Sequence, residues 1–103
     1  MNIQVTREAC CGQDDQTNRL QINFELLPSM TIHDVARLIG ESNFLQFSTP
    51  LLVIEAYSAG LRLFSIPSLN YADGKVEYFV EKTDLISRYL EDNKIEFHWP
   101  KDL

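Results

Sequence analysis

Residues 19–40 read RLQINFELLPSMTIHDVARLIG and contain a strand, a break and a helix in close succession. Apolar and polar side chains alternate over the first part of this stretch, which predicts a strand with one buried face. The apolar members of the alternation are Leu20, Ile22, Phe24 and Leu26. Pro28 is expected to end the strand, because proline interrupts a regular ladder.

A helix is predicted directly after this break. Thr31 is placed to cap it, and Asp34 three residues later completes a capping box with Asp in place of Glu. The apolar residues that follow have the i, i+3, i+4, i+7 spacing of an amphipathic helix. They are Ile32, Val35, Ala36 and Ile39. Gly40 is expected to end the helix in the left-handed conformation.

A first strand is expected before this stretch, over residues 2–8, with Ile3 and Val5 on one face. It would form a hairpin with the strand 20–26, joined by a long polar connection over residues 10–18.

Further short elements are expected toward the C-terminus. They are a central strand that includes the apolar run 51–54, a turn at 58–60, a fourth strand over 61–66, a fifth over 75–81, a second helix over 83–93 and a last strand over 94–99. Thr83 would cap the second helix, and its apolar stripe would be Leu85, Ile86, Tyr89 and Leu90. We therefore predict a single α+β domain over residues 1–103, in the order ββαβββαβ, with a mixed sheet of five to six strands and two helices.

The opening of this order resembles a β-grasp domain, the fold of ubiquitin-like proteins. The resemblance is carried by a hairpin, a helix across the sheet and a strand that returns to the middle, and it covers mainly residues 1–66. It implies a fold and no activity. Because the sequence ends Pro100-Lys101-Asp102-Leu103 and has no Gly-Gly tail, we expect neither conjugation nor a thiocarboxylate carrier.

Charge and composition exclude several functions. The 103 residues hold 15 acidic and 9 basic side chains, a net charge of −6, and the excess of acid is spread along the chain. A nucleic-acid ligand is not expected, because such binders present clustered Lys and Arg to phosphates. We expect no membrane association, since no apolar run approaches the ~18 residues that a span needs. No secretory signal is visible, so the cytoplasm is the expected compartment.

The loop Cys10-Cys11-Gly12-Gln13-Asp14-Asp15 holds both cysteines and an adjacent carboxylate pair. Adjacent thiols are poorly arranged for a disulfide or for zinc chelation, and the neighbouring acids raise the pKa of a thiol. His33 and His98 complete the set of possible zinc ligands, but their positions suggest no common site. We therefore predict no catalytic residue, cofactor or metal, and keep a thiol-dependent enzyme that uses Cys10 and Cys11 as the weakest alternative.

The favoured interpretation is a non-enzymatic module that binds another protein, of the inhibitor or immunity type, with a basic partner. Phe64 and Phe79 fall opposite the other apolar residues of their strands, so they would line an exposed patch or else form a second core. The candidate partner-binding residues are Asp14, Asp15, Phe64, Tyr71, Asp73, Glu77, Phe79, Glu91 and Asp92. The alternative is a homodimeric subunit that associates through a strand edge, at 75–81 or 94–99.

Overall fold

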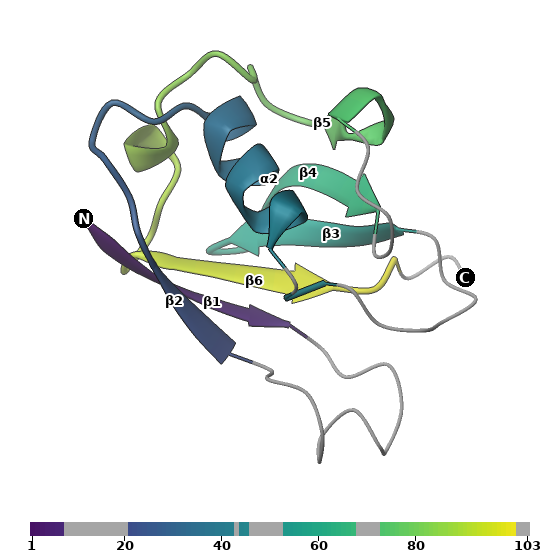
Figure 1. Ribbon diagram of the computed structural model, residues 1–103, viewed down its shortest axis with the longest axis horizontal. Coiled ribbons are helices and arrows are strands. Elements are labelled where there is room, and N and C mark those ends of the chain that lie inside the picture. The colour runs from purple at the N-terminus through teal and green to yellow at the C-terminus, as the bar shows by residue number, and fades with distance from the viewer. Residues whose placement is uncertain (8–20, 43, 46–52, 68–72, 101–103) are drawn as a thin grey trace.

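Six strands form one mixed sheet, and a helix crosses one of its faces in this computed structural model, which describes residues 1–7, 21–42, 44–45, 53–67 and 73–100 (Figure 1). The strands are β1 (Asn2–Arg7), β2 (Gln21–Glu25), β3 (Val53–Ser58), β4 (Leu61–Pro67), β5 (Glu77–Tyr78) and β6 (Lys94–His98). Their order across the sheet is β2-β1-β6-β3-β4-β5. β1 and β6 are parallel, and the other neighbours are antiparallel. The predicted α+β class and mixed sheet are confirmed.

The first hairpin forms as predicted, and a central strand is present at Val53–Ser58, although residues 51–52 of the predicted run lie outside the described residues. β1 pairs with β2 without interruption, from Asn2 opposite Glu25 to Thr6 opposite Gln21. β3 lies inside the sheet, between β6 and β4. It is joined to β4 by a two-residue turn in which Ala59 and Gly60 both have positive φ angles, of 50° and 83°. Such left-handed turns suit hairpins because their twist matches that of the strands.

The helix α2 (Ile32–Glu41) begins as predicted. The Thr31 hydroxyl oxygen accepts a hydrogen bond from the Asp34 N–H at 3.2 Å, and the Asp34 carboxylate accepts one from the Thr31 N–H at 3.0 Å. The prediction for Gly40 is wrong, because Gly40 is a buried helical residue and the helix runs on to Glu41. The cap is Ser42, whose hydroxyl donates to the Ile39 carbonyl at 2.6 Å. Among the described residues, no helix is long and apolar enough to cross a membrane.

The hydrophobic core lies between α2 and the sheet. Its fully buried side chains include Ile3, Val5, Ile32, Val35, Ile39, Ile54, Phe64, Ile66, Ile95 and Phe97. Each buried side chain of this size contributes about 1.5–3 kcal/mol relative to an exposed one. The core therefore supplies the main force that holds the helix on the sheet.

Phe64 was expected on the opposite face of its strand from the other apolar residues, and this prediction is wrong. The pairing of β3 with β4 shifts register between Ala56 and Tyr57, so that Phe64 lies opposite Ala56 in the core. A β-bulge of this kind adds one residue to a strand and reverses the alternation beyond it. Phe64 is 0 % exposed, and its ring packs edge-on against Phe97 at 6.1 Å between centroids. It is therefore not available as a surface anchor.

The predicted second helix, over residues 83–93, is wrong. Only Ile86–Arg88 turns as a helix, in one 3-10 turn that we label η2. The backbone before it is already bonded to the start of α2, since the carbonyls of Asp84 and Lys82 accept the N–H groups of Ile32 and His33 at 3.0 Å each. The Asp84 carbonyl therefore pairs with α2 and not with the Arg88 N–H, as it would in a helix over 83–93.

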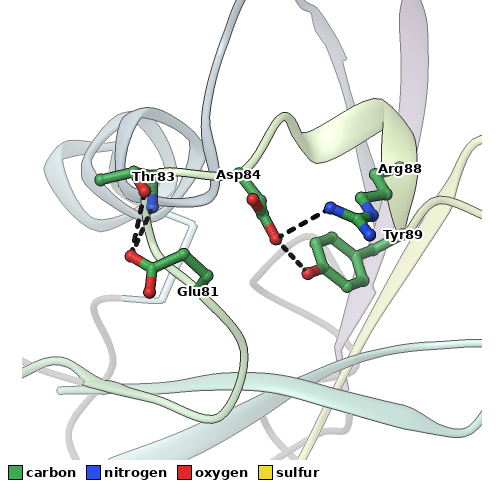
Figure 2. A network of polar contacts seen from close by, with 5 residues as sticks. All are labelled: Glu81, Thr83, Asp84, Arg88 and Tyr89. Carbon is green, nitrogen blue, oxygen red and sulfur yellow. Dashed lines mark hydrogen bonds and ion pairs between the residues drawn. The ribbon is translucent and has the colours of Figure 1, made fainter.

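Side chains in this segment also form polar contacts with one another (Figure 2). The Thr83 hydroxyl donates to the Glu81 carboxylate at 3.0 Å. The Asp84 carboxylate accepts a hydrogen bond from the Tyr89 hydroxyl at 2.5 Å and lies 3.6 Å from the Arg88 guanidinium. Thr83 therefore does not cap a helix.

The two predicted sheet edges have different outcomes. β6 lies between β1 and β3, so the prediction that residues 94–99 form an edge is wrong. Residues 75–81 do lie at an edge, but only Glu77–Tyr78 pair there. They follow a second 3-10 turn, η1 (Asp73–Lys75). The opposite edge is β2.

Candidate functional site

The face of the sheet away from α2 carries polar and aromatic side chains from four adjacent strands. Residues directly opposite each other on paired strands point to the same face. One row of this face therefore contains Glu77, Ser65, Glu55 and His98, and the next contains Arg62, Tyr57 and Glu96. We define the polar sheet face by Glu55, Tyr57, Arg62, Glu77, Phe79, Glu96 and His98.

Glu55 is the centre of this face. One carboxylate oxygen accepts a hydrogen bond from the Tyr57 hydroxyl at 3.0 Å, and the other accepts one from the Arg62 guanidinium at 3.0 Å. The Glu55 side chain is only 11 % exposed. Burial of a carboxylate is costly unless it is paired, and here both oxygens have partners.

Aromatic rings extend the cluster on both sides of Glu55. The Arg62 guanidinium lies over the Phe79 ring at 3.8 Å from its centroid. On the other side, the rings of Tyr57 and His98 meet edge to face at 5.5 Å, and His98 Nε2 lies 3.4 Å from the Glu96 carboxylate. Arg62 is thus held by an ion pair and a cation–π contact at once, so it loses little freedom on meeting a ligand.

The pKa of the Tyr57 hydroxyl is raised, mainly by desolvation and then by its hydrogen bond to Glu55. Tyr57 is therefore a neutral donor at physiological pH. Because the Tyr57 proton points to Glu55 and both Glu55 oxygens are occupied, the pair is not poised as a nucleophile and a general base. The arrangement is chemically suited to recognition by hydrogen bonds and ring contacts.

An acidic rim lies at the end of this face, where the chain enters β6. Glu91 and Asp92 are exposed, and together with Ala59, Lys94 and Glu96 they line a depression of about 200 Å³. Buried Ser58 fixes this corner, since its hydroxyl donates to the Lys94 carbonyl at 2.9 Å and accepts from the Glu91 N–H at 3.0 Å. The rim is therefore anchored to the hairpin of β3 and β4.

The candidate residues predicted from the sequence are only partly brought together. Glu77 and Phe79 belong to the polar sheet face, and Glu91 and Asp92 form its rim. Phe64 is in the core, and Asp73 is described only as the first residue of η1. Asp14, Asp15 and Tyr71 lie outside the described residues.

The two histidines lie in separate parts of the fold. His33 lies in the first turn of α2, with its ring 6.3 Å from that of Tyr78, whereas His98 lies on the polar sheet face. Within residues 1–7, 21–42, 44–45, 53–67 and 73–100, no three His, Cys, Asp or Glu side chains could hold a metal ion. Cys10 and Cys11 lie outside these ranges, so the thiol alternative stays a prediction.

Sequence reasoning missed the centre of the site. Glu55 and Tyr57 follow the apolar run 51–54 directly, so the polar alternation of β3 begins only where that run ends. The sequence does not reveal that Arg62 lies opposite Tyr57, because that pairing depends on the register shift between β3 and β4. The signal in the sequence that could have located this face is the alternation of β6, which places Glu96 and His98 on one face of the sheet.

Comparisons with known proteins find no match from which a function could be inferred. No family model, no curated protein and no solved structure matches the chain.

Proposed function

We propose that this protein is a small acidic module that binds another protein and has no enzymatic activity, and that it binds through the polar sheet face. The observation that carries the proposal is the arrangement around Arg62, which is held between the Glu55 carboxylate and the Phe79 ring. Arg and Tyr are enriched among the residues that dominate binding energy at protein interfaces. Here Arg62 and Tyr57 share one carboxylate on an ordered sheet.

Preorganisation supports this proposal. Ordering a long side chain at an interface costs about 0.5–1.5 kcal/mol, and a surface that is already ordered avoids much of that cost. Arg62 remains 47 % exposed although both of its contacts are formed. It can therefore meet a partner in the geometry that it already has.

Charge favours a basic partner. Glu77, Glu96, Glu91 and Asp92 are all exposed on or beside the polar sheet face. Acidic groups around an interface speed the approach of a basic protein, and salt weakens this effect. An inhibitor or immunity-type protein directed against a basic target is consistent with this distribution.

The test begins with the immobilised full chain and an extract of its source cells. We expect one partner to be retained in stoichiometric amount, and we expect the purified partner to bind Tyr57→Ala or Phe79→Ala at least about thirtyfold more weakly, the loss of a hot-spot residue. Leu27→Ala is the matched control, because Leu27 is an apolar side chain that is 66 % exposed and lies outside the polar sheet face. Retention of no stoichiometric partner, or equal binding by all the variants, would contradict the proposal.

We also propose that the fold is β-grasp-like and that the protein acts in the cytoplasm. The fold proposal is supported by the sheet order, in which the first and last strands are parallel neighbours and a helix follows the first hairpin. This likeness supports a fold only, and the function rests on the polar sheet face.

A homodimeric subunit is the second candidate function. The observation that favours it is the outer edge of β2, with which none of the described strands pairs and which is long enough to pair with another strand.

A further inference from the structure

β2 is the outermost strand at one side of the sheet. Its inner neighbour is β1, and the pairing between them is regular over all five residues of β2, without a bulge. The strand at the other side, β5, has only two residues, which is too few to direct the pairing of a second chain. The two edges therefore differ in their capacity to bind another strand.

The hydrogen bonds at the start of the chain reveal which groups of β2 face outward. The Leu26 N–H donates to the Met1 carbonyl at 2.6 Å, and the Met1 amino group donates to the Leu26 carbonyl at 2.9 Å. Met1 and Leu26 are therefore a hydrogen-bonded pair, and in an antiparallel ladder such pairs alternate with non-bonded ones. Phe24 and Ile22 also bond to β1, so the N–H and C=O groups of the other three residues point away from it. These are Gln21, Asn23 and Glu25.

This outward edge has few of the features that block strand pairing. Proteins usually protect a free edge with Pro, Lys, a bulge or an inward-pointing charge. β2 reads Gln-Ile-Asn-Phe-Glu, and its only charged residue is Glu25 at one end. In the part of the chain that the structure describes, no strand pairs with this outer edge.

We propose that β2 pairs with β2 of a second copy of this chain, antiparallel and about a two-fold axis at Asn23. In this register Asn23 lies opposite Asn23 of the other copy, and Gln21 lies opposite Glu25 of the other copy. All of these residues have outward backbone groups, so each opposed pair exchanges two hydrogen bonds. The two sheets then form one continuous sheet, and the two-fold axis closes the assembly as a dimer.

The side chains are complementary in the same register. The Gln21 amide can donate to the Glu25 carboxylate, so a neutral donor faces each acid and no like charges oppose one another. On the core-side face, Ile22 lies opposite Phe24 of the other copy. Both side chains are only half-buried against the core, and contact between them across the axis would cover more of their apolar surface.

The decisive experiment measures the mass of the full chain by sedimentation over a range of concentrations. We expect a dimer for the wild type and a folded monomer for Asn23→Pro. Proline removes an N–H that points away from β1, and an edge strand tolerates it at such a position. Asn23→Ala is the control, because it keeps the backbone N–H, and it should remain a dimer.

A second pair of variants keeps the test valid if Asn23→Pro does not fold. Gln21 is exposed, so substitutions there should not affect folding of the monomer. Gln21→Glu would oppose two acids across the axis and weaken the dimer, whereas Gln21→Lys would strengthen it. The expected change in the dimer Kd is roughly two- to thirtyfold in each direction, from two symmetric pairs.

A monomer at every concentration, or a dimer whose Kd is the same in all the Gln21 and Asn23 variants, would overturn the proposal. If Tyr57→Ala dimerises with the same Kd as the wild type, the dimer forms through the β2 edge and not through the polar sheet face.

Discussion

Residues 31–42 and residues 83–93 begin with the same local signals, and they fold differently. Each starts with a Thr in position to cap a helix, has an Asp in its first turn and continues with apolar residues at helical spacing. The first becomes the ten-residue helix α2, with its capping box formed. The second contains a single 3-10 turn, and it buries Ile86 while Leu85 is 47 % exposed.

The difference lies in what the backbone of each segment is bonded to. In α2 the Thr31 side chain accepts a hydrogen bond from its own helix. The carbonyls of Asp84, in the second segment, and of Lys82, directly before it, accept hydrogen bonds from the first turn of α2. Ile86 donates in turn to the Met30 carbonyl at 3.0 Å. The second segment thus completes the cap of the first helix, which shows that local helix signals yield to a tertiary partner for the same backbone groups.

The largest expected effect separates Ile86 from Leu85. Ile86→Ala should lower the free energy of unfolding by about 2–5 kcal/mol, because it leaves a cavity in the core. Leu85→Ala should change it by less than about 0.5 kcal/mol, because the side chain is largely exposed. Urea denaturation followed by circular dichroism measures both. Equal losses in the free energy of unfolding would mean that Leu85 and Ile86 share one buried stripe, as a helix over 83–93 would require.

A smaller effect is expected when the two Thr residues are compared. Thr31→Ala should destabilise the protein by about 0.5–2 kcal/mol, since it removes an N-cap. Thr83→Ala removes only a hydrogen bond to exposed Glu81 and should cost less than about 0.5 kcal/mol. The same denaturation experiment compares them, and a larger cost at Thr83 would contradict the assignment of the cap to Thr31.

The smallest effect is a shift in a pKa within the second segment. The hydrogen bond to Asp84, followed by desolvation, raises the pKa of Tyr89 above its usual value. Since the folded state favours the protonated phenol, the stabilisation is present below the usual tyrosine pKa and is lost as the pH rises through the folded-state pKa. Asp84→Ala should move this pKa back toward its usual value.

Absorbance of tyrosinate during a pH titration measures this shift, and Tyr89→Phe identifies the Tyr89 signal by difference. An unchanged midpoint in Asp84→Ala would refute the role of Asp84. Arg88→Ala is the matched control, because the Arg88 charge acts on Tyr89 in the opposite direction and lowers its pKa.

Part of the site was predictable from the sequence, and part was not. The alternation of Ile95 and Phe97 with Glu96 and His98 correctly predicts a strand with a polar face. Glu91 and Asp92 were predicted only as candidate partner-binding residues, and the structure places both in an exposed acidic rim. The prediction of Phe64 as a surface residue failed, because strict alternation does not include the added residue of a bulge.

Local pattern in the sequence was sufficient for the strand β2, the capping box at Thr31, the amphipathic face of α2 and the turn after Ser58. Each depends on side chains only a few residues apart, whose preferences act within one element. The tertiary structure decided that β6 lies inside the sheet, that Phe64 turns into the core, that the carbonyls of Lys82 and Asp84 cap α2, and that Glu55 binds both Tyr57 and Arg62 on one face. These features depend on which strands become neighbours and in which register, because a shift of one residue exchanges the two faces of a strand.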